Sequence, residues 1–187
     1  MWWVYQPLAP TRWREQRVEC GGLIGLWRWP RALRSLLGMS DQAVVIEVAE
    51  HATPEVLEGL NRILPQLSSS APALSLEELE EICVNDTVFI ARDNGAIVGS
   101  LTLVIFRLPT GLRAWIEDVV VDQAARGRGV GEALNKAAIK ATFDSGARTL
   151  DLTSRPSREA ANRLYRKLGF KARETNVYRF AGENWEA

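Results

Sequence analysis

The stretch VVVDQAARGRGVGEALNKAA, residues 119–138, decides the fold of this chain of 187 residues. It begins with three valines, which favour a β-strand. It ends in a segment where Val130, Leu134 and Ala138 recur at the spacing of one helix face. Two arginines and three glycines lie between these segments, at Arg126, Gly127, Arg128, Gly129 and Gly131. The stretch therefore predicts a strand, a glycine-rich turn and a helix that runs from about Arg128 to Ser145 and ends at Gly146.

The glycine-rich turn has the properties of a binding site for a diphosphate. The first N–H groups of a helix have no acceptor inside it, and the macrodipole adds positive charge there. Such a terminus binds anions, phosphate above all. Glycine lets a ligand approach the backbone closely, and Arg126 and Arg128 add charge-assisted donors. The alternative is a helix start that merely tolerates glycine.

Two common phosphate motifs do not match this turn. A P-loop requires a lysine and a hydroxyl residue after its last glycine, and neither follows here. A dinucleotide motif requires a third glycine where this chain has Glu132 or Leu134. The pattern that does match is [RQ]-x-x-G-x-[GA], with Arg126, Gly129 and Gly131.

The sequence SREAANRLYRKLGF, residues 157–170, predicts a second amphipathic helix. Its core stripe consists of Ala161, Leu164 and Leu168. Arg158, Asn162 and Tyr165 form a separate stripe at the border of the core. A phenol and an amide at such a border suit a cleft, although a tyrosine packed by its ring with its hydroxyl in water fits the pattern as well.

Taken together, the glycine-rich turn and the segment AANRLYRKLGF resemble the GCN5-related N-acetyltransferases, over roughly residues 43–180. The resemblance implies a mixed α/β fold with a mostly antiparallel central sheet flanked by helices. It implies acetyl-coenzyme A as co-substrate and direct transfer of the acetyl group to a primary amine in a ternary complex, without a metal. The residues that it places at the coenzyme are Val119, Val121, Arg126, Gly127, Arg128, Gly129, Val130, Gly131, Glu132, Asn162 and Tyr165.

The same resemblance assigns roles to three side chains. Tyr165 would protonate the departing thiolate, and tyrosine is protonated at neutral pH because its reference pKa is about 10. In related diamine acetyltransferases an adjacent Glu-Asp pair matches Glu117 and Asp118. Glu117 would act as a base through water, and Asp118 would attract the cationic substrate. Strand alternation predicts opposite faces for these two residues. The alternative is a pair of solvated or salt-bridged carboxylates.

The remaining elements follow from local signals. Further strands are expected over 43–50, 113–122, 147–154 and 174–180, and Asn94-Gly95 marks the turn of a hairpin. Helices are expected after the N-caps Thr53 and Ser75. The predicted order is β-α-α-β-β-β-α-β-α-β.

Composition narrows the partners and the compartment. The net charge is zero, which favours neither nucleic acid nor an anionic membrane as a partner of the core domain. Two distant cysteines and one histidine, His51, argue against a disulfide framework, a zinc site and a Ser-His-Asp triad. We therefore expect a cytoplasmic enzyme that acts on a small-molecule or peptide amine, with residues 174–180 available as the edge of a homodimer.

Residues 1–40 form an extension that we expect to be poorly ordered, in front of a domain over residues 41–187. Residues 1–38 carry six arginines, two glutamates and five of the seven tryptophans. Three interpretations stay open: an upstream extension before a true start at Met39, an organelle presequence, or an interfacial anchor. The extension could also be the functional part, as a membrane or nucleic-acid arm.

The acceptor is the least determined part of the prediction. The segments 53–85 and 106–113 carry no diagnostic motif. Acidic side chains at Glu77, Glu78, Glu80 and Glu81 could favour a cationic amine such as a polyamine, a lysine side chain or an aminoglycoside, or could simply form a solvated helix face. A non-catalytic domain that binds an acyl-coenzyme A is the alternative function, because fold does not fix chemistry.

Overall fold

The computed structural model describes residues 44–180 of the chain. The chain divides into two compact units, Met1–Thr153 and Ser154–Ala187, and each is described by itself. The predicted extension, residues 1–40, lies outside the described residues. The prediction of one domain over residues 41–187 therefore stays a prediction.

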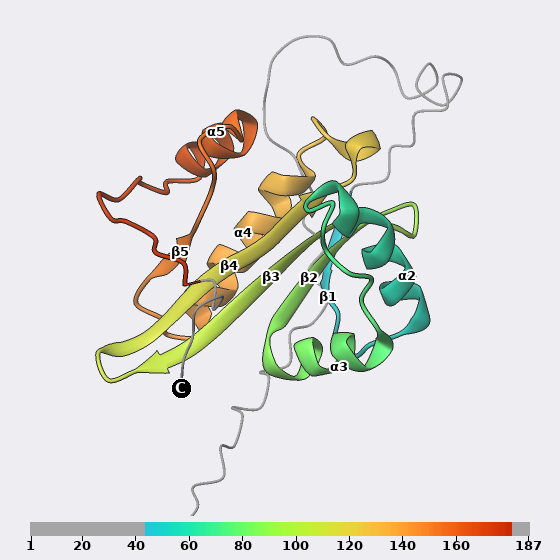
Figure 1. The fold of residues 1–187 in the computed structure, drawn as a ribbon, viewed down its shortest axis with the longest axis horizontal. Helices are drawn as coiled ribbons and strands as arrows, with labels where there is room; N and C mark the ends of the chain where they lie inside the picture. Colours follow the sequence, from blue (N-terminus) through green and yellow to red (C-terminus); the bar gives the residue numbers. More distant parts are fainter. Residues whose placement is uncertain (1–43, 181–187) are drawn as a thin grey trace, which may run out of the picture. The chain divides into compact units, whose positions relative to one another are not determined.

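A five-stranded sheet is the centre of the first unit (Figure 1). Its strands are β1 (Val45–Val48), β2 (Thr87–Asp93), β3 (Ala96–Leu108), β4 (Gly111–Val121) and β5 (Leu150–Leu152). They follow one another in the order β1-β2-β3-β4-β5, and every pairing is antiparallel except that of β4 with β5. The predicted mixed α/β class with a mostly antiparallel sheet is confirmed.

Helices cover both faces of this sheet. They are α2 (Pro54–Ile63), α3 (Leu76–Asn85) and α4 (Val130–Asp144), with the short 3-10 turns η1 (Leu64–Gln66) and η2 (Gln123–Ala125). On one face α2 packs so closely that a Cβ atom on Gly59 would lie 2.7 Å from Cδ1 of Ile97. On the other face α4 packs against β3, where a Cβ atom on Gly99 would meet Val130 at 3.0 Å.

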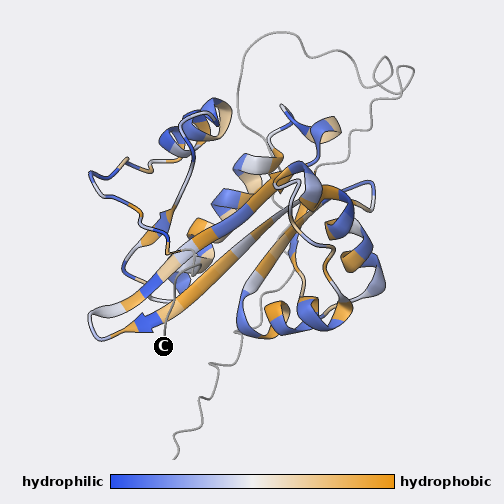
Figure 2. Ribbon diagram, viewed as in Figure 1, coloured by the Kyte–Doolittle hydropathy of each residue, from blue (hydrophilic) through white to orange (hydrophobic). Residues whose placement is uncertain are grey.

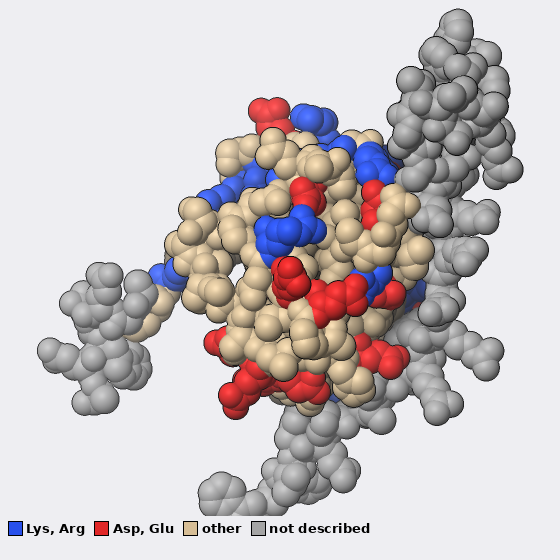
Figure 3. All heavy atoms as spheres, turned by 90° about the vertical axis from the view of Figure 1, so that its right-hand side faces the viewer, with Lys and Arg blue, Asp and Glu red and all other residues tan. Residues whose placement is uncertain are grey.

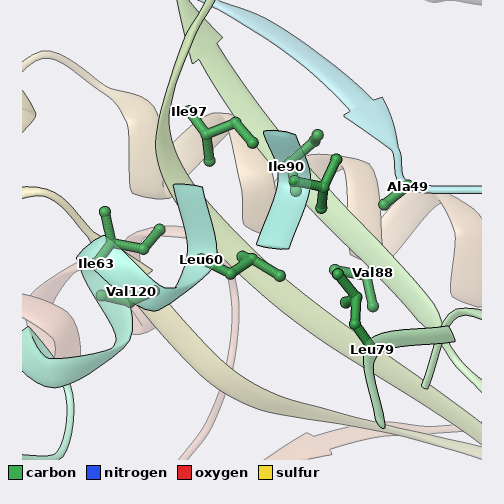
Figure 4. Close-up of a cluster of buried hydrophobic side chains, with 9 residues drawn as sticks. Ala49, Leu60, Ile63, Leu79, Val88, Ile90, Ile97 and Val120 are labelled. Atoms are coloured by element: carbon green, nitrogen blue, oxygen red, sulfur yellow. The ribbon is translucent and has the colours of Figure 1, made fainter. Parts of the chain in front are cut away.

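The core between the sheet and the helices α2 and α3 is apolar. Figure 4 shows its side chains, among them Leu60, Ile63, Leu79, Val88 and Val120, converging from both helices and from three strands. The hydropathy of the ribbon in Figure 2 shows the same division, with apolar residues concentrated along the strands. Burial of these side chains, at roughly 25 cal/mol per Å² of apolar surface, is the main force that holds this layer together.

Local signals placed most of the boundaries correctly. Thr53 and Ser75 are the N-caps of α2 and α3, as predicted. Asn94 and Gly95 adopt positive φ angles of 51° and 85°, which confirms the tight hairpin turn. Helix α4 ends before Gly146, whose φ of 79° gives the expected left-handed C-terminal position.

The second unit contains α5 (Glu159–Lys167). The predicted closing strand over residues 174–180 is not formed, because residues 168–180 contain neither helix nor strand. A strand requires a neighbour for its N–H and C=O groups, and no described segment pairs with these residues. Val177, Tyr178 and Phe180 are 77%, 88% and 72% exposed. The predicted homodimer edge therefore has no strand in this structure, and dimerisation stays a prediction.

Candidate active site

The turn between β4 and α4 has a conformation that requires glycine. Gly127 and Gly129 have φ angles of 76° and 83°, in the left-handed region that costs other residues about 1–2 kcal/mol. The strand end before them is fixed by Asp122, which caps η2 and pairs with Arg62. The glycines thus let the chain reverse direction directly in front of α4.

The N-terminus of α4 is open. Its N-cap is Gly129, which has no side chain to accept a hydrogen bond from the first turn. The first intrahelical bond runs from the N–H of Ala133 to the C=O of Gly129, so the N–H groups of Val130 and Gly131 precede it. Apart from its two chain neighbours, no residue among 44–180 would have a heavy atom within 4 Å of a Cβ atom on Gly127 or Gly129. The first turn of α4 therefore has N–H groups without an intrahelical acceptor and open space in front of them. An anion that binds at a helix terminus requires both.

Both arginines of the turn are exposed and positioned by their own chain. Nε of Arg126 donates to the C=O of Val121 at 3.2 Å. The guanidinium of Arg128 lies 2.7 Å from the carboxylate of Asp93, which raises the pKa of Arg128. Since a guanidinium has five N–H donors, each arginine keeps others for a phosphate.

The side chain of Glu132 is paired within α4. Its carboxylate lies 2.8 Å from Nζ of Lys136, one turn further along the helix. Its side chain is therefore engaged along the helix.

A β-bulge in β4 interrupts strand alternation after Glu117, while Glu117 and Asp118 keep the opposite faces that alternation predicts. Thr102 pairs with Glu117, but Ser100 pairs with Val120, so two residues of β4, Asp118 and Val119, lie opposite one residue of β3. Asp118 has a φ of 48°, and aspartate is among the few residues that tolerate it. Strict alternation fails here because of the extra residue, and Glu117 shares a face with Val120, which packs against α2.

The carboxylates of Glu117 and Asp118 are exposed. Within residues 44–180 neither forms a salt bridge, so the salt-bridged alternative is wrong for the described part of the chain. Both carboxylates are accessible to a ligand.

The second edge of β4 is free over part of its length. β5 pairs with β4 only from Ala114 to Ile116, so in the described part of the chain no strand pairs with β4 on this side from Glu117 to Val121. Val119 and Val121 belong to this free edge, which an extended ligand could join.

In the second unit, Tyr165 lies on α5 beside an aromatic neighbour. Its ring meets that of Phe170 edge to face, with centroids 5.9 Å apart and planes at 70°. Burial raises the pKa of the Tyr165 phenol, and the positive charge of Arg158 partly offsets this rise. The phenol therefore keeps its proton throughout the neutral range, as an acid for a thiolate must.

Asn162 has a structural role that the sequence did not show. Its side-chain NH₂ donates to the C=O of Arg155 at 2.9 Å and to that of Pro156 at 3.5 Å, which holds the segment before α5. Any bond from this side chain to a ligand would have to use its carbonyl oxygen.

Three further features escaped the sequence analysis. Asp93 holds Arg128 from a strand 35 residues away in sequence, and a bulge carries Asp118. Asp86, the C-cap of α3, is a half-buried carboxylate whose pKa is raised by burial. No motif surrounds Asp86 or Asp93 in the sequence; the only local signal for the bulge is that aspartate tolerates a positive φ.

Residues 44–180 contain neither a metal-binding cluster nor a helix that could span a membrane. They contain no group of three or more His, Cys, Asp and Glu side chains arranged to hold a metal ion. None of their helices combines the length and the apolar character needed to cross a membrane. The thiol of Cys83 is half-buried and its pKa is raised, mainly by burial, which makes it a poor nucleophile.

The fold and the open helix terminus fit the family that the two motifs indicate. Residues 54–170 match the model of the acetyltransferase (GNAT) family, and the chain belongs to this family. The resemblance inferred from the two motifs is confirmed, and the protein is an acetyltransferase.

Individual relatives agree with this assignment. The chain is 37% identical over 128 residues to a glucosamine 6-phosphate N-acetyltransferase of Trypanosoma brucei brucei, covering 58% of this chain and 79% of that protein. A putative acetyltransferase from Agrobacterium tumefaciens superposes with a TM-score of 0.63 at 28% identity, covering 72% of this chain and 98% of the other. An acetyltransferase from Trypanosoma brucei gives a TM-score of 0.60 at 28% identity, over 74% and 99% of the two chains.

Proposed function

We propose that this acetyltransferase uses acetyl-coenzyme A and transfers the acetyl group directly to a primary amine in a ternary complex. The open N-terminus of α4 carries this proposal, because its glycines, unused N–H groups and two arginines suit a diphosphate. The scarcity of cysteines favours the cytoplasm as the compartment.

Two parts of the first unit would hold the co-substrate. The pyrophosphate would accept hydrogen bonds from the first turn of α4 and from Arg126 and Arg128. The amide groups of the pantetheine arm would join the free edge of β4 near Val119 and Val121, as an added strand does. An N–H group of this edge would polarise the thioester carbonyl.

Glu117 and Tyr165 would move the protons of the reaction. Glu117 takes a proton from the acceptor ammonium through water, which frees the nitrogen lone pair. The nitrogen then forms a bond to the carbonyl carbon, the carbon–sulfur bond breaks, and Tyr165 gives its proton to the sulfur. The acetylated nitrogen loses its second proton, which returns through water to the tyrosinate, and Glu117 releases the first proton to solvent. The products are an N-acetyl amine and coenzyme A. General acid–base steps of this kind are each worth about 10²–10⁴-fold in rate.

An amino sugar phosphate is the first acceptor to test, because the Trypanosoma brucei brucei relative is named for glucosamine 6-phosphate. A thiol-release assay with acetyl-coenzyme A across a panel of amines would measure acceptor use. We expect acetylation of at least one amine and loss of most activity in Glu117→Gln. Tight binding of acetyl-coenzyme A with no transfer to any amine would instead support a non-catalytic acyl-coenzyme A sensor.

A further inference from the structure

One part of the sheet face that carries Glu117 is not closed by the helices of the first unit. The strand register places Val88, Thr102 and Glu117 in one row across β2, β3 and β4. The next row on this face contains Val104 of β3 and Trp115 of β4. Asp86, the residue just before β2, lies at the β2 end of this row. We call Asp86, Thr102, Val104, Trp115 and Glu117 the open face.

The helices cover only one end of this surface. Val88 is buried under Leu79 of α3, whereas Thr102, Val104 and Trp115 are half-buried. Figure 1 shows β3 and β4 continuing past α3. Side chains of the open face are therefore available to a ligand that lies on the first unit.

Asp86 is an unusual member of this surface. It already has an extended conformation, with φ −128° and ψ 170°, so alternation directs it to the same face as Val88. Its pKa is raised by burial, with no attractive partner to offset it. Within residues 44–180 it forms no salt bridge. Partial burial of a carboxylate without a cation costs some free energy in the free protein, and a cationic ligand would lower that cost.

Trp115 borders the open face beside Glu117. It lies on the same strand as Glu117 and in the same row as Asp86, with Val104 between Trp115 and Asp86. The positions of Asp86 and Glu117 are two strands and two residues apart, which corresponds to about 12 Å between their Cα atoms. An aromatic ring at the border of a surface that carries two carboxylates favours a cation. The wider surroundings are also acidic: residues 44–153 contain 16 Asp and Glu against 9 Lys and Arg, and Figure 3 shows acidic side chains on the side of α2 and α3.

We propose that Asp86 is a specificity-determining residue that binds a second cationic group of the acceptor, while the reacting amine lies at Glu117. The preferred acceptor is then an elongated molecule with two amino groups. This inference rests on the proposed function, because it takes Glu117 as the position of the reacting amine.

Arg113 provides the competing possibility. It pairs with Phe106 in the row beyond Trp115, and a phosphate could bind there. Its guanidinium donates to Oγ1 of Thr110 at 3.4 Å and keeps other N–H donors for a phosphate. A phosphate at Arg113 is therefore the outcome that the test must distinguish from a cation at Asp86.

Acceptor preference tests this inference. The full-length protein would be assayed with 1,6-diaminohexane, 6-aminohexan-1-ol, 6-aminohexanoate and glucosamine 6-phosphate. We expect kcat/KM for the diamine to exceed that for the amino alcohol about tenfold, the value of one hydrogen bond to a charged group. Asp86→Asn should abolish this preference, and Asp86→Lys should shift it to 6-aminohexanoate.

Glu58→Gln is the matched control, because Glu58 is an exposed carboxylate on α2 outside the open face. It should keep the preference for the diamine. An unchanged preference in Asp86→Asn, or a preference of the wild type for glucosamine 6-phosphate over the diamine, would overturn the inference.

A binding measurement separates this inference from the proposed function. Calorimetry with 1,6-diaminohexane in the presence of coenzyme A reports binding without turnover. Binding that weakens about tenfold in Asp86→Asn, together with no transfer by the wild type, would refute the proposed function and retain the cation site. Equal binding by both proteins would refute the cation site.

Discussion

The N-termini of α3 and α4 both begin with N–H groups that have no acceptor inside the helix, but only α3 has a side-chain cap for them. In α3, Oγ of Ser75 accepts the N–H of Glu78 at 3.2 Å, and the carboxylate of Glu78 accepts the N–H of Ser75 at 2.8 Å. In α4 the corresponding position is Gly129, which has no side chain to offer. One terminus is closed by a side chain of its own helix, and the other has no side-chain cap.

If α4 binds a diphosphate as proposed, this difference separates a terminus used for stability from one used for binding. Relative to glycine, a Ser, Thr, Asp or Asn cap would stabilise a helix by only about a few tenths of a kcal/mol, and its side chain would occupy the place of a phosphate. Gly127 and Gly129 instead keep the backbone exposed in a conformation that few other residues adopt. The predictions below test whether the two termini are as distinct as their geometry indicates.

Replacement of Gly129 should have the largest effect. A Cβ atom in Gly129→Ala would strain the left-handed backbone and stand in front of the first turn of α4. We expect the Kd for acetyl-coenzyme A, measured by calorimetry, to rise about 10³-fold, the equivalent of two hydrogen bonds to a charged group.

Gly95 provides a matched control for that substitution. Its φ of 85° is close to the 83° of Gly129, and its Cβ position is equally open. Gly95→Ala should therefore lose a similar free energy of unfolding, about 1–2 kcal/mol, and bind acetyl-coenzyme A like the wild type. Equal loss of binding in both variants would mean that backbone strain, not the open terminus, controls binding.

Tyr165→Phe should affect turnover without affecting binding. Removal of the phenol should lower kcat about 10²-fold and leave the Kd for acetyl-coenzyme A unchanged. Burial raises the pKa of this phenol. As the pH rises, wild-type activity should therefore fall only at a pH above the ordinary pKa of tyrosine. Wild-type turnover in the variant would remove Tyr165 from the role of acid.

Loss of the side-chain cap on α3 should lower stability without affecting binding, in contrast to the replacement of Gly129. Ser75→Ala should lower the free energy of unfolding by about 1 kcal/mol, measured by urea denaturation, with no change in acetyl-coenzyme A binding. A change in binding of the same order as in Gly129→Ala would show that the two termini are not independent.

The pH dependence of that cap gives the smallest effect. Hydrogen bonds from Ser75 lower the pKa of Glu78 below its usual value. A carboxylate with a lowered folded-state pKa stabilises the protein above its ordinary pKa, and this contribution is lost as the pH falls through the folded value. The difference in stability between Ser75→Ala and the wild type should therefore shrink in acid, and a difference that grows in acid would contradict this account.

Features that depend on a few neighbouring residues were predictable from the sequence. Ser75 followed by Glu78, Asn94-Gly95 and the glycines before α4 each fix a local backbone geometry. The two motifs around Gly129 and Tyr165 also indicated the family, which the match over residues 54–170 confirms.

Features that depend on distant residues were not predictable. The partner of Arg128 is Asp93, on another strand. The bulge at Asp118 is set by the register with β3, and it changes the face of Glu117 relative to Val120. The sequence ETNVYRF has the composition of a strand, but a strand forms only where a neighbouring strand pairs with it.

Binding of acetyl-coenzyme A and of acetyl-pantetheine, compared by calorimetry on the full-length protein, tests the central claim most directly. Acetyl-pantetheine has the thioester and the arm but lacks the pyrophosphate and the adenosine 3′-phosphate attached to it. If the open terminus of α4 holds the diphosphate, acetyl-coenzyme A should bind at least about 100-fold more tightly. Equal affinities, or no heat from acetyl-coenzyme A at millimolar concentration, would contradict the account.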